Sequence, residues 1–238
     1  MIRITRIALD RSLDDRLKYR TLRLALRGAD PKSARRSWKG AANERAGIKD
    51  ALLHIAVGIE RCMYCGDSRG TDIDHFEPIR LTPLRTFDWG NHLLACSSCN
   101  SNAKRDAYPC DDDGDTLLIN PTVEDPSDHL ELTLSVGKYA GRTHKGCVTI
   151  QVFQLNRTDL RIGREAAFAR CKSMLRDYLN LEASGRLDEA ATTKLALARQ
   201  PFADVLLAMY KVADLPGAAT VLGGSDVLGV LRRWRERL

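Results

Sequence analysis

The segment CMYCGDSRGTDIDHFEP, residues 62–78, brings two kinds of metal-binding side chain together in one short stretch. Cys62 and Cys65 form a C-x-x-C pair, and Asp74 and His75 follow nine residues after the second cysteine. A C-x-x-C pair makes a tight turn whose two sulfurs face the same ion. The segment on its own leaves two interpretations open: His75 is a third ligand of that ion, or it belongs to separate chemistry.

A second C-x-x-C pair, Cys96 and Cys99, lies within NHLLACSSCNSNAK (91–104). Because four ligands close a structural zinc site, the two pairs saturate one ion and leave His75 for another role. The 30 residues between the pairs are more than a plain zinc ribbon needs. We therefore expect a structural zinc site that holds a separate functional site within its loop.

The order C-x-x-C, D-H, N, C-x-x-C-N, K across residues 62–104 resembles that of the zinc-containing HNH endonucleases, whose core is the ββα-metal fold. The resemblance implies a metal-dependent endonuclease that hydrolyses nucleic-acid phosphodiester bonds, DNA in preference to RNA. By the same resemblance, Asn91 is the middle asparagine of the motif, which positions the histidine base. Asn100 is its last position, a metal ligand that is histidine in many members.

The chemistry of each residue type agrees with these roles. A neutral imidazole titrates near physiological pH, so His75 is suited to take a proton from the attacking water. Asp74 and Asn100 offer hard oxygen donors, and Mg²⁺ usually takes only one or two protein oxygens beside water and phosphate. An amide oxygen favours Mg²⁺ or Mn²⁺ over softer ions.

Three basic residues near the motif are candidates for contacts with nucleic acid. Lys104 lies one helical turn beyond Asn100, where its ammonium group would hold a phosphate. Arg80 and Arg85 flank the loop that follows His75, and we expect them to touch nucleic acid or to remain solvated.

Two further residues beside the motif remain undecided. Asp72 shares a strand face with Asp74, and its position is more typical of a solvated neighbour than of a third ligand. His92 follows Asn91 directly and is either structural or directed at phosphate.

The charge of the chain is concentrated near its beginning. The net charge is +6 over 238 residues, but residues 1–50 alone carry 14 Lys or Arg against 6 Asp or Glu. Such a basic region favours a polyanionic partner, although a solvated helical surface is the alternative. No apolar run is long enough to span a bilayer and no signal peptide is evident, so we expect a cytoplasmic protein without a membrane partner.

The pattern predicts an α+β protein with a ββα-metal HNH core, a structural zinc clasp, a small antiparallel sheet and flanking N- and C-terminal helices. We expect a basic N-terminal helical region over 1–58, the nuclease core over 59–115, and the sheet with C-terminal helices over 116–238. Hydrophobic periodicity predicts the N-terminal helices at 10–28 and 42–58. It predicts the three strands of the small sheet at 116–120, 130–136 and 147–153. It also predicts four later helices, at 160–183, 187–200, 202–215 and 225–238.

A narrower resemblance covers about residues 60–170. The segments FDWGNHLLACSSCNSNAK (87–104), LLINPTVEDPSDHLELTL (117–134) and VTIQVFQLNRTDLRIGREAAF (148–168) are similar to the HNH subunit of Septu-type and retron-associated anti-phage systems. That group often has Glu where this chain has Asp74. The resemblance implies an ATPase partner subunit that restrains the nuclease until infection. The apolar faces of the C-terminal helices either form a docking surface for this partner or simply pack in the core.

Two rival functions remain open. The chain could be a stand-alone restriction-type HNH nuclease whose flanking helices recognise DNA directly. It could also be a non-catalytic zinc-ribbon module that binds nucleic acid or protein without cutting, although such a module has no need for the D-H and C-N pairs.

Overall fold

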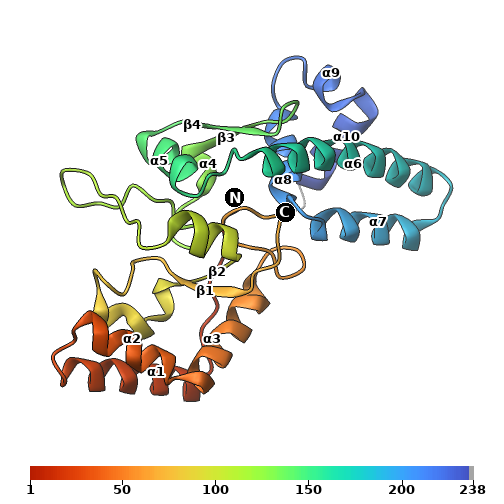
Figure 1. Cartoon of the computed structure of the whole chain (residues 1–238). Coiled ribbons are helices and arrows are strands. Elements are labelled where there is room, and N and C mark those ends of the chain that lie inside the picture. The colour runs from red at the N-terminus through yellow and green to blue at the C-terminus, as the bar shows by residue number, and fades with distance from the viewer. Residues whose placement is uncertain (236–238) are drawn as a thin grey trace.

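The computed structural model describes residues 1–235, and Figure 1 shows helices arranged around two small two-stranded sheets. Helices α1 to α3 lie at one end, the β1–β2 pair lies in the middle, and the C-terminal helices lie at the other end. The expected α+β class is confirmed. The last three residues of the helix expected over 225–238 lie outside the described residues.

The N-terminal region folds into α1 (Arg11–Ala25), α2 (Pro31–Lys39) and α3 (Ala42–Ile55). The carboxylates of Asp10 and Asp30 accept hydrogen bonds from the first backbone N–H groups of α1 and α2, so each helix has a side-chain cap. Sequence periodicity did not predict α2, because only one of its nine residues is buried.

The central region is built on two short antiparallel strands, β1 (Asp72–His75) and β2 (His92–Ala95). Their register pairs Asp74 with Leu93 and His75 with His92. The loop between them contains the short helices η1 (Pro83–Phe87) and η2 (Trp89–Asn91), and the wide helical segment η3 (Ser98–Lys104) follows β2. Two strands followed by a helical segment agree with the expected ββα-metal core.

The small sheet differs from the prediction. Strand β3 (Leu130–Thr133) pairs with β4 (Lys138–Gly141), which lies between the strands expected at 130–136 and 147–153. Of residues 147–153, predicted as a strand, 147–152 belong to helix α5 (His144–Val152), and Phe153 is its C-cap. Thr143 caps α5, and Gly146, Thr149 and Phe153 are buried at intervals of three and four residues. The β-branched residues there suggested a strand, but the helical burial pattern prevails.

Residues 116–120, also predicted as a strand, form no strand in the part of the chain that the structure describes. The backbone N–H of Ile119 donates to Thr149 Oγ1 at 3.0 Å instead of to a neighbouring strand. The short helix α4 (Pro126–His129) follows this segment. Residues 116–120 are therefore fixed against α5 by a side chain.

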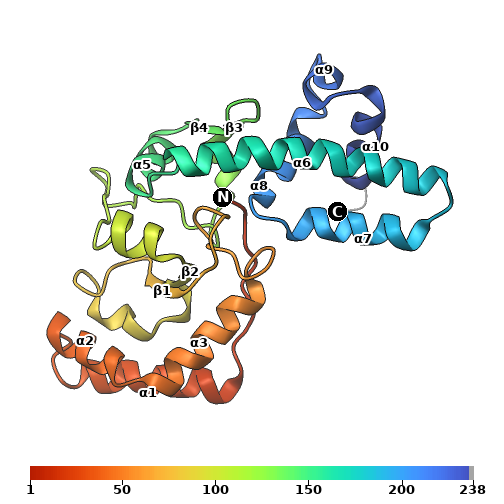
Figure 2. The same cartoon turned by 45° about the vertical axis from the view of Figure 1, so that its right-hand side comes forward.

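The C-terminal helices are α6 (Thr158–Ala183), α7 (Leu187–Arg199), α8 (Ala203–Val212), α9 (Ala218–Leu222) and α10 (Ser225–Arg235). The long helix α6 runs beside α7 in both views (Figure 2). In α10, Leu231 and Trp234 are buried, and Trp234 contacts the ring of Tyr178. Core packing rather than a free docking face therefore accounts for the apolar side of α10.

One continuous apolar core runs through the described residues from Met1 to Trp234. The extended segment before α1 contributes to it, because Ile4 N–H donates to Pro121 O at 2.8 Å. Arg6 from the same segment donates to the carbonyl of His92 at 2.8 Å. No helix in the described part is long and apolar enough to cross a bilayer.

Candidate active site and metal centre

The four cysteines predicted as zinc ligands meet at one point. Their sulfur atoms lie within 4.8 Å of one another, and all four residues are buried. Zn–S bonds of ~2.3 Å in a tetrahedron place sulfurs about 3.8 Å apart. Cys65 Sγ and Cys96 Sγ are separated by 3.9 Å, so the cluster fits zinc.

Backbone hydrogen bonds hold the two C-x-x-C turns in register with the sheet. Met63 N–H donates to Leu94 O at 2.9 Å, which attaches the first turn to β2. Asn100 N–H donates to Cys96 O at 2.9 Å, so the second turn leads directly into η3. Burial raises the pKa of the Cys62 thiol, and a bound cation would offset the cost of forming thiolates here. We call the two C-x-x-C turns with their four cysteines the clasp. The clasp fixes β1, β2 and η3 relative to one another.

His75 is held as a neutral imidazole with a defined tautomer. Its Nε2 lies 3.0 Å from the carbonyl oxygen of Thr86. Because a carbonyl only accepts hydrogen bonds, Nε2 carries the hydrogen and Nδ1 keeps its lone pair. Burial lowers the pKa of His75, which favours this neutral form. Nδ1 has no hydrogen-bond partner among the described residues and is available as a proton acceptor.

Two rings fix the orientation of this imidazole. His92 also donates from Nε2 to the Thr86 carbonyl at 3.0 Å, and its ring meets His75 edge-on at 4.9 Å. Trp38 of α2 contacts His75 edge-on at 4.5 Å and stacks on His92 at 5.2 Å. Burial also lowers the pKa of His92, so His92 is a neutral structural support.

Asn91 closes the loop that follows His75. Its Oδ1 accepts from Glu77 N–H at 2.7 Å, and its Nδ2 donates to the carbonyls of Glu77 and Arg85 at 3.0 and 3.2 Å. The side chain is almost fully buried, so these bonds do not compete with water. This arrangement suits the positioning role expected for Asn91.

Asp74 and Lys104 form a buried ion pair. Lys104 Nζ lies 2.9 Å from Asp74 Oδ1 and 2.8 Å from the carbonyl of His75. Tyr64 donates its hydroxyl to the other carboxylate oxygen of Asp74. Lys104 therefore does not face a phosphate in this structure, because the chain turns its ammonium group inward to neutralise Asp74.

Asn100 contacts a different carboxylate from the one expected. Its Nδ2 lies 3.3 Å from Oδ2 of Asp72, and Ser101 Oγ lies 3.5 Å from the same oxygen. The structure thus does not bring Asn100 into hydrogen-bond contact with Asp74. Asp72 and Asn100 are both partly exposed, and together with Asp74 they place three oxygen-bearing side chains on β1 and η3.

The two arginines expected at the nucleic acid occupy different environments. Arg85 forms ion pairs with Glu77 and Asp88, so its charge is already compensated. Arg80 is exposed and has no ion pair within the described residues. Of the two, only Arg80 offers an uncompensated charge.

Three contributors to the site were not predicted from the sequence. Thr86 acts through its main-chain carbonyl, which no residue type signals. Tyr64 lies between the first two cysteines, where only its place inside the C-x-x-C turn could have marked it. Trp38 lies in α2, a helix without an apolar stripe, and reaches His75 only through the tertiary fold.

The buried pair of Lys104 and Asp74 leads to a stability prediction. Lys104→Met leaves the Asp74 carboxylate without its cation and should lower the free energy of unfolding by about 3 kcal/mol or more. Lys104→Met combined with Asp74→Asn should recover at least half of that loss. Urea denaturation measures both changes.

Lys18→Met serves as the control, because Lys18 pairs with Asp14 on the exposed surface of α1. It should change the free energy of unfolding little. Equal losses for Lys104→Met and Lys18→Met would contradict the proposed role of the buried pair.

Comparison with known proteins agrees with this geometry. Residues 62–106 match the family model of the HNH endonuclease. The chain is 29% identical over 174 residues to the Septu protein PtuB of Bacillus thuringiensis, covering 66% of this chain and 64% of that protein. It is 24% identical over 143 residues to the Septu protein PtuB of Bacillus mycoides (strain KBAB4), covering 48% of each chain.

The chain thus spans less than two thirds of the length of these curated relatives. The family match covers the two C-x-x-C turns, β1, β2 and η3, which are the elements that form the site. Residues 62–106 are an HNH endonuclease domain.

Proposed function

We propose that this chain is a metal-dependent HNH endonuclease that hydrolyses phosphodiester bonds in DNA. The observation that carries the proposal is the state of His75: a neutral imidazole, fixed by the Thr86 carbonyl at Nε2, with Nδ1 left as an acceptor. A general base needs this protonation state and this fixed orientation. His92 also uses Nε2 on the Thr86 carbonyl and leaves Nδ1 without a partner, but His92 is fully buried, whereas His75 is partly exposed and can receive a proton from water.

In the proposed reaction, Nδ1 of His75 takes a proton from a water molecule as the water oxygen attacks phosphorus. The bond between phosphorus and the leaving oxygen breaks, and that oxygen departs with the electron pair. Asn91 keeps the loop after His75 closed, and Trp38 and His92 keep the imidazole from rotating. The protein thereby fixes the base before the substrate arrives.

Asp74 and Asn100, with Asp72 beside them, would hold a divalent cation, Mg²⁺ or Mn²⁺. Their carboxylate and amide oxygens are the donors that hard cations prefer. Such an ion supplies neutralisation of the charge that develops on the phosphate and the leaving oxygen. Lys104 and Tyr64 each engage one oxygen of the Asp74 carboxylate, so a cation would compete with these two contacts for Asp74.

The non-catalytic zinc ribbon is the weaker alternative. The clasp needs only the four cysteines, and it gives no reason for a neutral His75 with one free ring nitrogen. The reducing cytoplasm is the compartment in which these thiols would stay available to zinc.

The proposal predicts that His75→Ala abolishes cleavage of plasmid DNA. Loss of a general base typically lowers a rate by about 10²–10⁴-fold. The assay incubates the chain, alone and with its partner, with supercoiled plasmid and either Mg²⁺ or Mn²⁺. Nicked and linear products are measured by gel electrophoresis.

His144→Ala is the matched control, because His144 is exposed at the start of α5, outside the matched domain. It should cut at the wild-type rate. Cleavage by His75→Ala at the wild-type rate would contradict the role of His75. Absence of cleavage by the wild-type chain with either metal and with the partner present would contradict the nuclease proposal.

We further propose that the chain is the nuclease effector of an anti-phage system and works with an ATPase partner. The support is its similarity to proteins named Septu protein PtuB and the motif order over residues 60–170. The C-terminal helices retain exposed apolar side chains, such as Leu187 and Leu195, that a partner subunit could cover.

This partnership predicts that a gene for an ATPase lies beside the gene for this chain, and that the two proteins form a stable complex when the tagged chain is co-expressed with that ATPase. The two chains should co-elute in size-exclusion chromatography at micromolar concentration. Separate elution of the two proteins, with both folded, would argue against the partnership without affecting the nuclease assay.

A further inference from the structure

The excess positive charge of the N-terminal region is confined to one short segment. Residues 16–40 contain nine Lys or Arg and a single acidic residue, Asp30, a net charge of +8. Residues 1–50 as a whole also have a net charge of +8, so the rest of that region is neutral. The segment forms the second half of α1, the following turn and all of α2.

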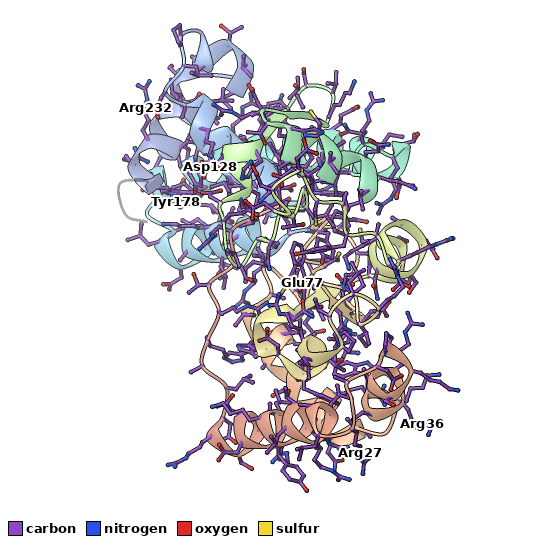
Figure 3. All side chains as sticks on the ribbon, turned by 90° about the vertical axis from the view of Figure 1, so that its left-hand side faces the viewer. Arg27, Arg36, Glu77, Asp128, Tyr178 and Arg232 are labelled. Atoms are coloured by element: carbon purple, nitrogen blue, oxygen red, sulfur yellow. The ribbon has the colours of Figure 1, made fainter. Side chains whose placement is uncertain are left out.

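The helices gather several of these residues around one groove. The groove has a volume of about 260 Å³ and lies between α1 and α2. Arg20, Arg23 and Arg27 line it from α1 and the turn, and Arg36 lines it from α2. Figure 3 places Arg27 and Arg36 together at the outer edge of the N-terminal helices. We call this surface the arginine groove.

Most charges of the arginine groove have no internal partner. Arg20 donates to both carboxylate oxygens of Glu44, so its charge is already compensated. Within the described residues, Arg23, Arg27 and Arg36 make no ion pair, and all three are exposed. Like charges held this close repel one another unless an anion lies between them. The groove is therefore suited to an external anion.

The arginine groove is connected to the candidate active site through α2. Arg36 lines the groove, and Trp38, two residues later, contacts the ring of His75. Trp38 also lines a second hollow of about 410 Å³, together with Arg45, Lys49 and Asp72. Residues two apart lie on nearly opposite faces of a helix, so a duplex in the groove would reach the strand that carries Asp72 and His75 by passing around α2.

We propose that the arginine groove binds the phosphate backbone of duplex DNA and guides the duplex toward His75. The inference rests on the proposed nuclease function and names the surface by which the substrate is held. A guanidinium group binds phosphate oxygens through paired hydrogen bonds, and exposed arginines gain affinity by displacing counterions from DNA. The groove is lined by arginine, serine and glycine, with one leucine. Such a lining is suited to contacts with the DNA backbone rather than with the edges of the bases.

The lining also favours a duplex over a single strand. Proteins that bind single-stranded nucleic acid stack its bases on aromatic side chains. No aromatic residue lines the arginine groove: the nearby Tyr19 lies against the guanidinium of Arg23, and Trp38 is engaged with His75 and His92. A duplex keeps its bases stacked inside and offers only its backbone, which is what this surface can bind.

The test measures binding of full-length protein to a fluorescent DNA duplex by anisotropy. His75→Ala is used as the background, in buffer without divalent cations, so that cleavage does not interfere. Arg27→Gln combined with Arg36→Gln should weaken binding about tenfold at 0.1 M salt. It should also lower the slope of log affinity against log salt by about 1.8, about 0.9 for each lost phosphate contact.

Arg142→Gln combined with Arg170→Gln is the control, since both arginines are exposed and lie outside α1 and α2. It should change the affinity less than twofold. Equal losses for the two double variants, or no change in the salt slope for the groove variant, would overturn the proposal. Tighter binding to duplex or single-stranded RNA of the same sequence would overturn the assignment to DNA.

The binding result is independent of the cleavage assay. If the groove variant loses affinity while the wild-type chain never cuts, the arginine groove stands and the nuclease proposal fails. If the wild-type chain cuts in a His75-dependent way and the groove variant binds normally, the nuclease proposal stands and the groove is not the binding surface.

Discussion

Four sulfur atoms from two turns meet within 4.8 Å, and the geometry of the whole site depends on that contact. The strands beside it, β1 and β2, have four residues each, and a two-stranded sheet of this length is marginal in water. A zinc ion in the clasp would contribute folding free energy directly, because the site does not exist in the unfolded chain. A metal bound there would therefore stabilise a strand pair whose own backbone hydrogen bonds are too few to do so.

The clasp places the chemical groups, but it does not set their protonation. Partial burial lowers the pKa of His75 and so favours its neutral form, and Trp38 and His92 provide part of that burial by lying against its ring. The Thr86 carbonyl then fixes which nitrogen carries the hydrogen. The helix α2 thus contributes to two surfaces: Trp38 contacts the His75 ring, and Arg36 lines the arginine groove.

Local spacing predicted the parts of the site that lie close together in sequence. The C-x-x-C pairs identified all four cysteines of the cluster, because a tight turn forces both sulfurs to one side. The pairing of Lys104 with Asp74 could not be predicted in this way, since it joins residues 30 positions apart through the packing of η3 on β1. The same limit applies to Trp38. At residues 147–153 the local signal was misleading, because alternating Val and Ile suggested a strand where tertiary contacts favour a helix.

The central claim is that the clasp is a closed four-sulfur site and that His75 is left outside it. Zinc K-edge X-ray absorption on the purified full-length chain tests this directly. The account predicts a single shell of four sulfurs at about 2.3 Å. A mixed shell with a nitrogen at about 2.0 Å would contradict it, because a histidine would then be a ligand of the structural ion.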